Sequence, residues 1–197
     1  MPAQHHRKTL RTQLRAARRQ LSASQQKQAA EGVSFQLSRY FSNDSHLKMG
    51  TYLANDGEVD LSLFVGSTQQ IFSFSLPVLH PVCKGHLLFL EYASHTSLIQ
   101  NKYGILEPEL ACHHVMPTYE LDVILMPLVG FDNDGNRLGM GGGYYDRTLA
   151  YTRHAVKKPL LVGVAHDLQH VESLPYASWD IPLNAIVTPT RLHHFSV

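Results

Sequence analysis

The sequence has few cysteines, no long apolar run and no zinc-ligand pattern, and each absence excludes a class of protein. Two cysteines, Cys83 and Cys112, do not make a disulfide framework, and we expect both to pack as small apolar side chains. No apolar stretch reaches the roughly 18–20 residues of a membrane span. No apolar signal segment follows the basic start. We therefore expect a cytoplasmic protein with no membrane partner.

Metal-binding patterns are also missing. The 13 histidines include three adjacent pairs, but neither HExxH nor a Cys/His zinc spacing occurs. Neighbouring residues on a helix or strand point apart, so an adjacent pair alone is a poor chelate. We expect most of these histidines to lie at the surface.

Acidic residues are absent from the first 30 positions. Seven basic residues and no acid precede Glu31, whereas the remainder holds all 16 acids and ten of the 17 basic residues. The net charge of +1 is therefore the sum of a basic arm and a mildly acidic body. Such a balance argues against nonspecific nucleic-acid binding, so we expect no nucleic-acid partner.

Hydrophobic periodicity predicts a single α/β domain over residues 1–197. Apolar residues at helical spacing predict a helix over about residues 7–21, and a second helix, capped by Ser22 or Ser24, is expected to end near Phe41. Helices are also expected over residues 60–64 and 144–151. Six apolar runs have strand length, namely 48–53, 71–76, 87–92, 123–129, 160–165 and 185–188. This alternation predicts a largely parallel sheet, in which ligands bind at the carboxyl ends of the strands.

A glycine-rich loop follows the apolar run 123–129. Four glycines occupy five positions from Gly139 to Gly143, between Arg137 and Arg147. Glycine allows positive φ and close backbone approach, and free N–H groups before a helix bind anions. Asp146 is placed to hold Mg2+ together with substrate phosphates. Because neither a Walker A nor a Rossmann pattern is present, a phosphate-binding loop and a plain mobile turn both stay open.

Several charged side chains have a structural alternative to a functional role. Asp146 is equally compatible with an acid at a helix N-terminus, Asp180 with a loop acid and Glu58 with a solvated acid after a turn.

The arginines of the first helix, Arg11, Arg15, Arg18 and Arg19, share one face. This face suits a solvated surface, a nucleic-acid arm or a phosphate clamp. We assign Arg18 and Arg19 to solvent.

The string RLGMGGGYYDR, residues 137–147, resembles the signature of the 5-formyltetrahydrofolate cyclo-ligase family. Further family motifs follow the same order along nearly the whole chain: RKTLR at 7–11, YLANDGEVD at 52–60, LPV at 76–78, YGILEP at 103–108, VGVAHDLQ at 162–169, LP at 174–175 and WDIPL at 179–183. Many ordered motifs are far more specific than a glycine run alone.

The resemblance implies a three-layer α/β/α sandwich and an enzyme. The implied reaction is the ATP- and Mg2+-dependent conversion of 5-formyltetrahydrofolate, with or without a polyglutamate tail, to 5,10-methenyltetrahydrofolate. ADP and phosphate are released after phosphorylation of the formyl oxygen and attack by N10. We expect a monomer. The alternative is a non-catalytic relative that binds nucleotide or RNA, although such a protein would need no paired metal acids.

The resemblance also implies roles for individual residues. The implied catalytic residues are Arg137, Tyr145 and Asp146, and Asp146 and Asp180 would hold Mg2+. The implied ATP contacts are Arg7, Lys8, Arg11, Arg137, Leu138, Gly139, Met140, Gly141, Gly142, Gly143, Tyr144 and Tyr145. The implied folate contacts are Leu53, Glu58, Met140, Gly141, Gly142, Gly143, Tyr144 and Tyr145. Tyr52 and Tyr103 are compatible with a pterin site or with packing. Met140 stands where the family often has Arg, and Arg7 where it usually has Lys, so Lys8 is an alternative phosphate ligand.

Overall fold

Two helices begin the chain, and a capping box fixes where the second one starts. The computed structural model describes residues 2–195, with α1 at Pro2–Arg19 and α2 at Ala23–Tyr40. The Ser22 hydroxyl accepts the Gln25 N–H at 3.3 Å, and the Gln25 side chain accepts the Ser22 N–H at 2.8 Å. The cap predicted at Ser22 is confirmed. Helix α1 begins at Pro2 and ends at Arg19, whereas the predicted range was about residues 7–21. The early start could not be predicted, because the polar residues before residue 7 show no apolar periodicity.

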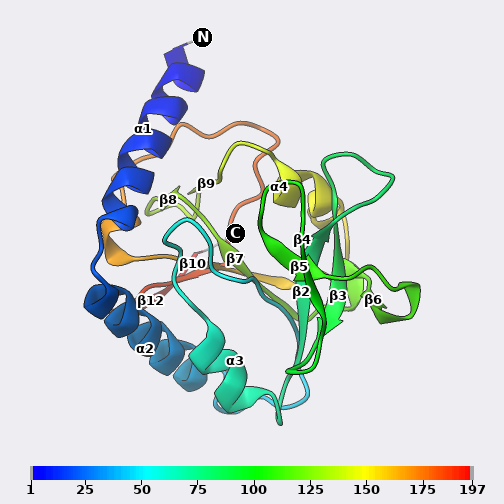
Figure 1. Ribbon diagram of the computed structural model, residues 1–197. Coiled ribbons are helices and arrows are strands. Elements are labelled where there is room, and N and C mark those ends of the chain that lie inside the picture. Colours follow the sequence, from blue (N-terminus) through cyan, green and yellow to red (C-terminus); the bar gives the residue numbers. More distant parts are fainter. Residues whose placement is uncertain (1, 196–197) are drawn as a thin grey trace.

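The central sheet has eight strands in the order β12-β11-β10-β7-β1-β2-β3-β6 (Figure 1). The strands are β1 (Lys48–Gly50), β2 (Ser73–Leu79), β3 (Leu87–Tyr92), β6 (Val115–Met116), β7 (Val123–Pro127), β10 (Leu160–Val164), β11 (Ala185–Val187) and β12 (Leu192–His194). The five strands from β11 to β2 are parallel, whereas β12 at one edge, and β3 and β6 at the other side of the sheet, pair antiparallel. The prediction of a largely parallel sheet is confirmed.

All six predicted strands are present. Six further strands of two or three residues each were not predicted. They are β6 and β12 of the central sheet and the strands of two small sheets, which join β4 (Leu98–Gln100) to β5 (Leu106–Pro108) and β8 (Gly130–Phe131) to β9 (Arg137–Leu138). Strands of two or three residues are too short to show a period in the sequence.

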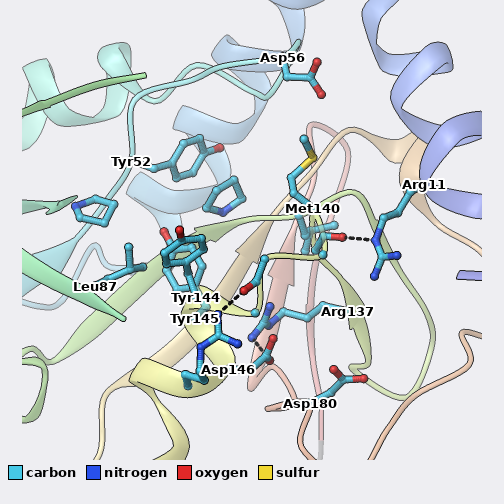
Figure 2. A pocket seen from close by; sticks show the side chains of 18 of the residues that line it. Arg11, Tyr52, Asp56, Leu87, Arg137, Met140, Tyr144, Tyr145, Asp146 and Asp180 are labelled. Atoms are coloured by element: carbon cyan, nitrogen blue, oxygen red, sulfur yellow. Dashed lines mark hydrogen bonds and ion pairs between the residues drawn. The ribbon is translucent and has the colours of Figure 1, made fainter. Parts of the chain in front are cut away.

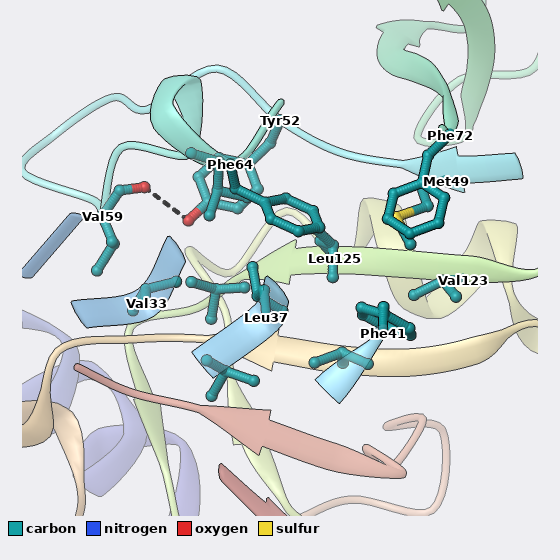
Figure 3. Close-up of a cluster of buried hydrophobic side chains, with 14 of the residues drawn as sticks. Val33, Leu37, Phe41, Met49, Tyr52, Val59, Phe64, Phe72, Val123 and Leu125 are labelled. Carbon is teal, nitrogen blue, oxygen red and sulfur yellow. Dashed lines mark hydrogen bonds between the residues drawn. The ribbon is translucent and has the colours of Figure 1, made fainter. Parts of the chain in front are cut away.

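Both faces of the sheet are covered, which explains why its strands are continuous apolar runs. On one face, α2 and α3 (Ser62–Thr68) bury side chains such as Leu37 and Phe64 against Met49, Val123 and Leu125 (Figure 3). On the other face, alternate strand residues including Ile124 and Leu161 pack against Leu149 and the C-terminal segment.

The second helical layer is thin. The helix predicted over 144–151 is split at Leu149 into α4 (Tyr144–Thr148) and the 3-10 turn η3 (Ala150–Arg153). Further 3-10 turns are η1 (Cys112–His114), η2 (Thr118–Glu120) and η4 (Asp167–Gln169). With α2 and α3 on the opposite face, the architecture is the expected α/β/α sandwich.

Helix α1 lies across the carboxyl ends of the strands and not over a face of the sheet (Figure 1). It contacts η4 and β8, and a Cβ on Gly130 would lie only 2.6 Å from Leu14 Cδ1. Its Arg18 is fully buried, so the assignment of that side chain to solvent is wrong. The arginine is buried because the chain after β1 folds over it, which helical spacing alone does not show.

Two further features concern the surface. Cys83 and Cys112 are both exposed and free, which corrects the expectation that they pack inside. Within residues 2–195, no helix is both long enough and apolar enough to cross a bilayer.

Two helical glycines allow a matched test of packing. A Cβ on Gly32 of α2 would lie 2.7 Å from the Pro189 carbonyl oxygen, whereas a Cβ on Gly66 of α3 would meet nothing within 4 Å. Both Gly→Ala changes gain helix propensity of up to about 1 kcal/mol. We expect Gly66→Ala to raise the free energy of unfolding and Gly32→Ala to lower it by about 1–3 kcal/mol through overpacking. Urea unfolding of both variants measures this, and a gain in both would contradict the packing of α2.

Candidate functional site

A cleft of about 1840 Å³ opens at the carboxyl ends of the parallel strands (Figure 2). Its walls are α1, the segment after β1, the glycine loop, the ends of β2 and β7, and the segment Pro175–Asp180. Ligands of open α/β sheets bind at such a position.

The glycine loop lines the cleft and leaves several of its amide groups without a hydrogen-bond partner among the described residues. Gly141 and Gly143 have φ of +98° and +64°, values that favour glycine. No N–H from Met140 to Gly143 donates to an acceptor among residues 2–195. Consecutive free amides of this kind form a concavity that binds anions.

Two arginines hold the loop through its carbonyl groups. Arg11 Nε donates to the Gly139 carbonyl at 2.7 Å, and Arg147 donates from Nη2 to Gly142 and from Nε to Gly85 at 2.9 Å. Burial, together with the charge of Arg7, lowers the pKa of Arg11. Three carbonyl groups of the loop, those of Gly139, Gly142 and Gly143, thus accept hydrogen bonds, whereas the N–H groups from Met140 to Gly143 remain unused.

The two candidate metal acids lie near each other, and each is paired with an arginine. Arg7 forms a fork on Asp180, with Nη1–Oδ2 at 2.6 Å and Nη2–Oδ1 at 3.2 Å. Arg137 Nη2 lies 2.6 Å from Asp146 Oδ1, which also accepts the Ile181 N–H at 3.2 Å (Figure 2). Arg137 is buried, and its Nε has no partner among the described residues. This end of the cleft therefore has an unused buried donor.

The two carboxylates at this end fit a metal cation that is also coordinated by a bound ligand. Within residues 2–195, no three His, Cys, Asp or Glu side chains gather as a metal site. Mg2+ is usually held by one or two carboxylates together with substrate phosphates. Asp146 and Asp180 match that requirement, whereas a cation bound by the protein alone would need more ligands.

A tight turn, Asn55–Glu58, forms the opposite side of the cleft. The Glu58 N–H donates to the Asn55 carbonyl at 3.0 Å, and Asp56 and Gly57 have φ of +54° and +78°. This is the pattern of a type I′ turn, which an Asp-Gly pair favours.

The two carboxyl groups of this turn have opposite pKa shifts. Burial raises the pKa of Glu58 to about 7, although the charge of Arg18 opposes the shift. Asp56 is also desolvated, but hydrogen bonds from Arg15, Arg19 and Arg18 lower its pKa to about 2. One turn thus presents a permanently charged carboxylate and one that titrates near neutrality.

Tyrosines form the wall between the two sides. Tyr52 is buried and donates to the Val59 carbonyl at 2.8 Å, so its hydroxyl is already occupied. Burial and the charge of Glu58 raise the pKa of Tyr145, whose ring lies 6.0 Å from the Arg137 guanidinium carbon. The hydroxyls of Tyr103 and Tyr144 lie 2.8 Å apart.

The structure brings nearly all of the residues singled out from the sequence to one cleft. Leu53, Lys8 and the loop residues line it, and Met140 lies at its rim with 52% of its surface exposed. Leu138 is the exception, because it is buried in β9 and its carbonyl accepts the Val129 N–H at 2.7 Å.

Other residues of the cleft were not singled out from the sequence. Asn101, Glu107 and Arg153 are lining residues of this kind, in addition to Arg15 and Arg19 of the basic helix face named above. Only the YGILEP motif, which contains Glu107, gave a signal for this group.

Comparison with known proteins gives the family. The profile of the 5-formyltetrahydrofolate cyclo-ligase family matches residues 3–189. The chain belongs to the 5-formyltetrahydrofolate cyclo-ligase family. It is 42% identical over 178 residues to the 5-formyltetrahydrofolate cyclo-ligase of Haemophilus influenzae, covering 90% of this chain and 94% of that protein. It is 41% identical over 183 residues to that of Escherichia coli K12, covering 91% and 98%.

A solved structure agrees with this assignment. The NMR structure of Aquifex aeolicus 5,10-methenyltetrahydrofolate synthetase superposes with a TM-score of 0.80 at 31% identity, covering 95% of this chain and 92% of that one. The resemblance drawn from the motifs, and the α/β fold that it implied, are therefore confirmed for this cyclo-ligase family member, which is an enzyme of the ligase class.

The raised pKa of Glu58 gives the cyclo-ligase a testable pH dependence of stability. A carboxyl whose pKa is higher in the folded state stabilises fully below its unfolded value, 4.5, and loses that contribution as pH rises to about 7. Glu58→Gln should abolish this pH-dependent loss of stability, because a Gln side chain does not ionise. We expect the variant to gain free energy of unfolding relative to wild type, on the order of 2 kcal/mol, between pH 4.5 and 7.5.

Urea unfolding across that range measures the effect, and Asp56→Asn is the control. Because the pKa of Asp56 is lowered, its contribution is present above 3.8 and lost as pH falls toward 2. The two difference curves should therefore change in different pH windows. A flat curve for Glu58→Gln would contradict the assignment.

Proposed function

We propose that this chain catalyses the ATP- and Mg2+-dependent conversion of 5-formyltetrahydrofolate to 5,10-methenyltetrahydrofolate, with release of ADP and phosphate. The observation that carries the proposal is one cleft that joins a loop of free amides and two carboxylates to a buried carboxylate on the opposite side. The names of the relatives support the folate substrate.

The nucleotide side is formed by α1 and the glycine loop. Its free amides and the unpartnered Nε of Arg137 are donors for phosphate oxygens. We assign ATP contacts to Arg7, Lys8, Arg11, Arg137 and residues 139–145. Leu138 supports the loop from within β9 instead. Because Arg7 is paired with Asp180 and Arg137 with Asp146, phosphate binding exchanges these ion pairs for arginine–phosphate contacts.

Asp146 and Asp180 would hold Mg2+ together with the nucleotide phosphates. When bound, Mg2+ supplies positive charge that neutralises the phosphate oxygens. Each Asp would then face the cation where it now faces its arginine, and the arginines would be available to the phosphates.

The folate side is formed by Leu53, Glu58 and the tyrosine wall. A buried carboxylate such as Glu58 accepts hydrogen bonds from N–H donors of a pterin. Tyr144, Tyr145 and Met140 border both sides of the cleft. A folate bound here would have its formyl group facing the glycine loop.

The chemistry requires positioning and charge neutralisation, not a protein nucleophile. The formyl oxygen attacks the γ-phosphorus of ATP, and the bond to the ADP oxygen breaks. The lone pair of N5 stabilises the resulting phosphorylated iminium. N10 then attacks the formyl carbon and loses its proton, and the carbon–oxygen bond breaks to release phosphate. Arg137 and the loop amides would neutralise the negative charge of the transferred phosphoryl group, and the partly buried Tyr145 covers part of that region.

The alternative, a nucleotide- or RNA-binding relative without catalysis, has less support. Asp56 pairs with Arg15, Arg18 and Arg19, so much of the basic face of α1 is neutralised within the chain. The remaining free cations face a cleft. RNA retardation in a gel at physiological salt, without turnover, would favour the alternative. A monomeric state and a cytoplasmic location stay predictions.

Asp146→Asn tests the catalytic assignment. We expect turnover, followed as ATP-dependent near-ultraviolet absorbance of the methenyl product, to fall on the order of 100-fold or more, because charge stabilisation of the phosphates is lost. Asp134→Asn is the control, since that acid is exposed in the preceding turn. Both variants should unfold cooperatively. Near-normal turnover of Asp146→Asn, or no product from folded wild type with Mg2+, would refute the proposal.

Arg11→Ala tests the nucleotide side. The variant removes the Nε bond to Gly139 and one cation of the cleft. We expect the KM for ATP to rise about 10-fold, equivalent to roughly 1.4 kcal/mol, with less than a two-fold change for 5-formyltetrahydrofolate. Arg39→Ala, an exposed arginine at the end of α2, is the control. Equal rises in both KM values would contradict the phosphate-clamp interpretation.

A further inference from the structure

One buried arginine connects the two sides of the cleft. Arg18 Nη1 donates to the Leu128 carbonyl at 2.9 Å, immediately after β7, and Nε donates to the Asp56 carbonyl at 2.8 Å. Nη2 lies 2.8 Å from Asp56 Oδ2 and 3.6 Å from Glu58 Oε1. Every nitrogen of this guanidinium is therefore engaged, mostly by the Asn55–Glu58 turn.

The turn needs such support because Asp56 adopts a positive φ, which an Asp-Gly pair accommodates in a type I′ turn but which is uncommon for a residue with a side chain. Asp56 is one of two non-glycine residues with positive φ among those described, and this conformation persists only where surrounding contacts impose it. Two other groups hold the turn at Gly57, whose carbonyl lies 3.0 Å from His166 Nε2 and accepts Gln26 Nε2 at 3.3 Å. Neither of them reaches Asp56 or Glu58. Asp56 is also held by Arg15 and Arg19 of α1. Glu58 Oε2 accepts the Asn55 N–H of the same turn at 3.1 Å. Among the described residues, however, only Arg18 links these carboxylates to the end of β7, through the Leu128 carbonyl.

Arg18 is also the cation nearest to Glu58. The other charged or titratable groups that act on Glu58 are Asp56 on the same turn and the hydroxyls of Tyr52 and Tyr145. The charge of Arg18 favours the ionised carboxylate, and burial opposes it. Loss of Arg18 would thus change both the direction and the charge of this group.

We propose that Arg18 is a positioning residue for the folate substrate: it fixes the Asn55–Glu58 turn on the sheet and thereby holds the Glu58 carboxylate in the orientation that receives the pterin. This inference rests on the proposed role of Glu58. A purely structural role, in which Arg18 anchors α1, gives a different result, because α1 carries the ATP-contacting residues Arg7 and Arg11. Weak anchoring of α1 would impair ATP use, whereas loss of the turn impairs folate use.

Steady-state kinetics with both substrates separates the two roles. Arg18→Lys keeps the charge but cannot form the fork to Leu128 and Asp56. We expect it to raise the KM for 5-formyltetrahydrofolate about 10-fold, as misplacement of a binding group does, while the KM for ATP changes less than two-fold. In the Glu58→Gln background the same change should have no further effect, because Arg18 acts through Glu58.

The pH profile gives a second readout. For wild type, kcat/KM for the folate should fall on the acid side as Glu58 becomes protonated. Arg18→Met removes the cation, so this acid limb should move to higher pH. Arg39→Met is the control, because Arg39 is an exposed arginine outside the cleft. It should leave both KM values within two-fold and the acid limb in place.

The outcomes distinguish this proposal from the one on which it rests. Equal rises in both KM values, or an effect of Arg18→Lys that persists in Glu58→Gln, would overturn it. If Glu58→Gln raises the folate KM and Arg18→Lys does not, only the role of Arg18 is wrong. If Glu58→Gln has no effect, both assignments are wrong. Should the Arg18 variants fail to fold, Asp56→Asn decides: a selective rise in the folate KM supports the proposal, and no rise overturns it.

Discussion

The structure depends on the burial of one charged group, the guanidinium of Arg18. Among the α1 side chains that the structure describes, residues 4–19, it is the only buried one. A buried cation is tolerated only when it is paired and hydrogen-bonded, and the Asp56 carboxylate together with the carbonyls of Asp56 and Leu128 meet that requirement. The helix therefore docks on a polar contact and not on an apolar stripe. Nearer its N-terminus, the same helix is held independently by Arg7 on Asp180 and by Arg11 on the Gly139 carbonyl.

The two sides of the cleft differ in how their charged groups are paired. At the nucleotide side, Arg7 and Arg137 are each matched by an aspartate, whereas Lys8 and Arg11 form no ion pair within residues 2–195 and leave this region positively charged. At the folate side, two carboxyl groups two positions apart differ in pKa from about 2 to about 7, because one is surrounded by arginines and the other is buried. A single tight turn thus provides a partner for three arginines of α1 and, in the proposed function, an acceptor for the pterin.

Much of the fold and of the site could be predicted from the sequence, for identifiable reasons. Strands buried on both faces, such as β7 and β10, are continuous apolar runs. The glycine loop is recognisable because four glycines in five positions are rare outside ligand-binding loops and tight turns. Arg18 could not be predicted, because helical spacing shows which residues share a face but not which distant segment covers it. The break at Leu149, the inward position of Leu138 and the two-residue strands depend on tertiary packing. Cys83 and Cys112 were misjudged because a residue type gives only an average tendency to be buried.

The way α1 docks has a consequence for the stability of the molecule in use. Its apolar residues Leu10, Leu14 and Ala17 are only half-buried, so this helix contributes little apolar surface to the core and belongs to the part of the fold that opens at low free-energy cost. The same helix forms a wall of the nucleotide side. A ligand that bridges α1 and the glycine loop would bind only the closed form, so its binding free energy would be added to the docking of the helix. Assembly of the catalytic cleft and local folding of the N-terminus are, on this view, a single equilibrium whose position follows the concentration of nucleotide.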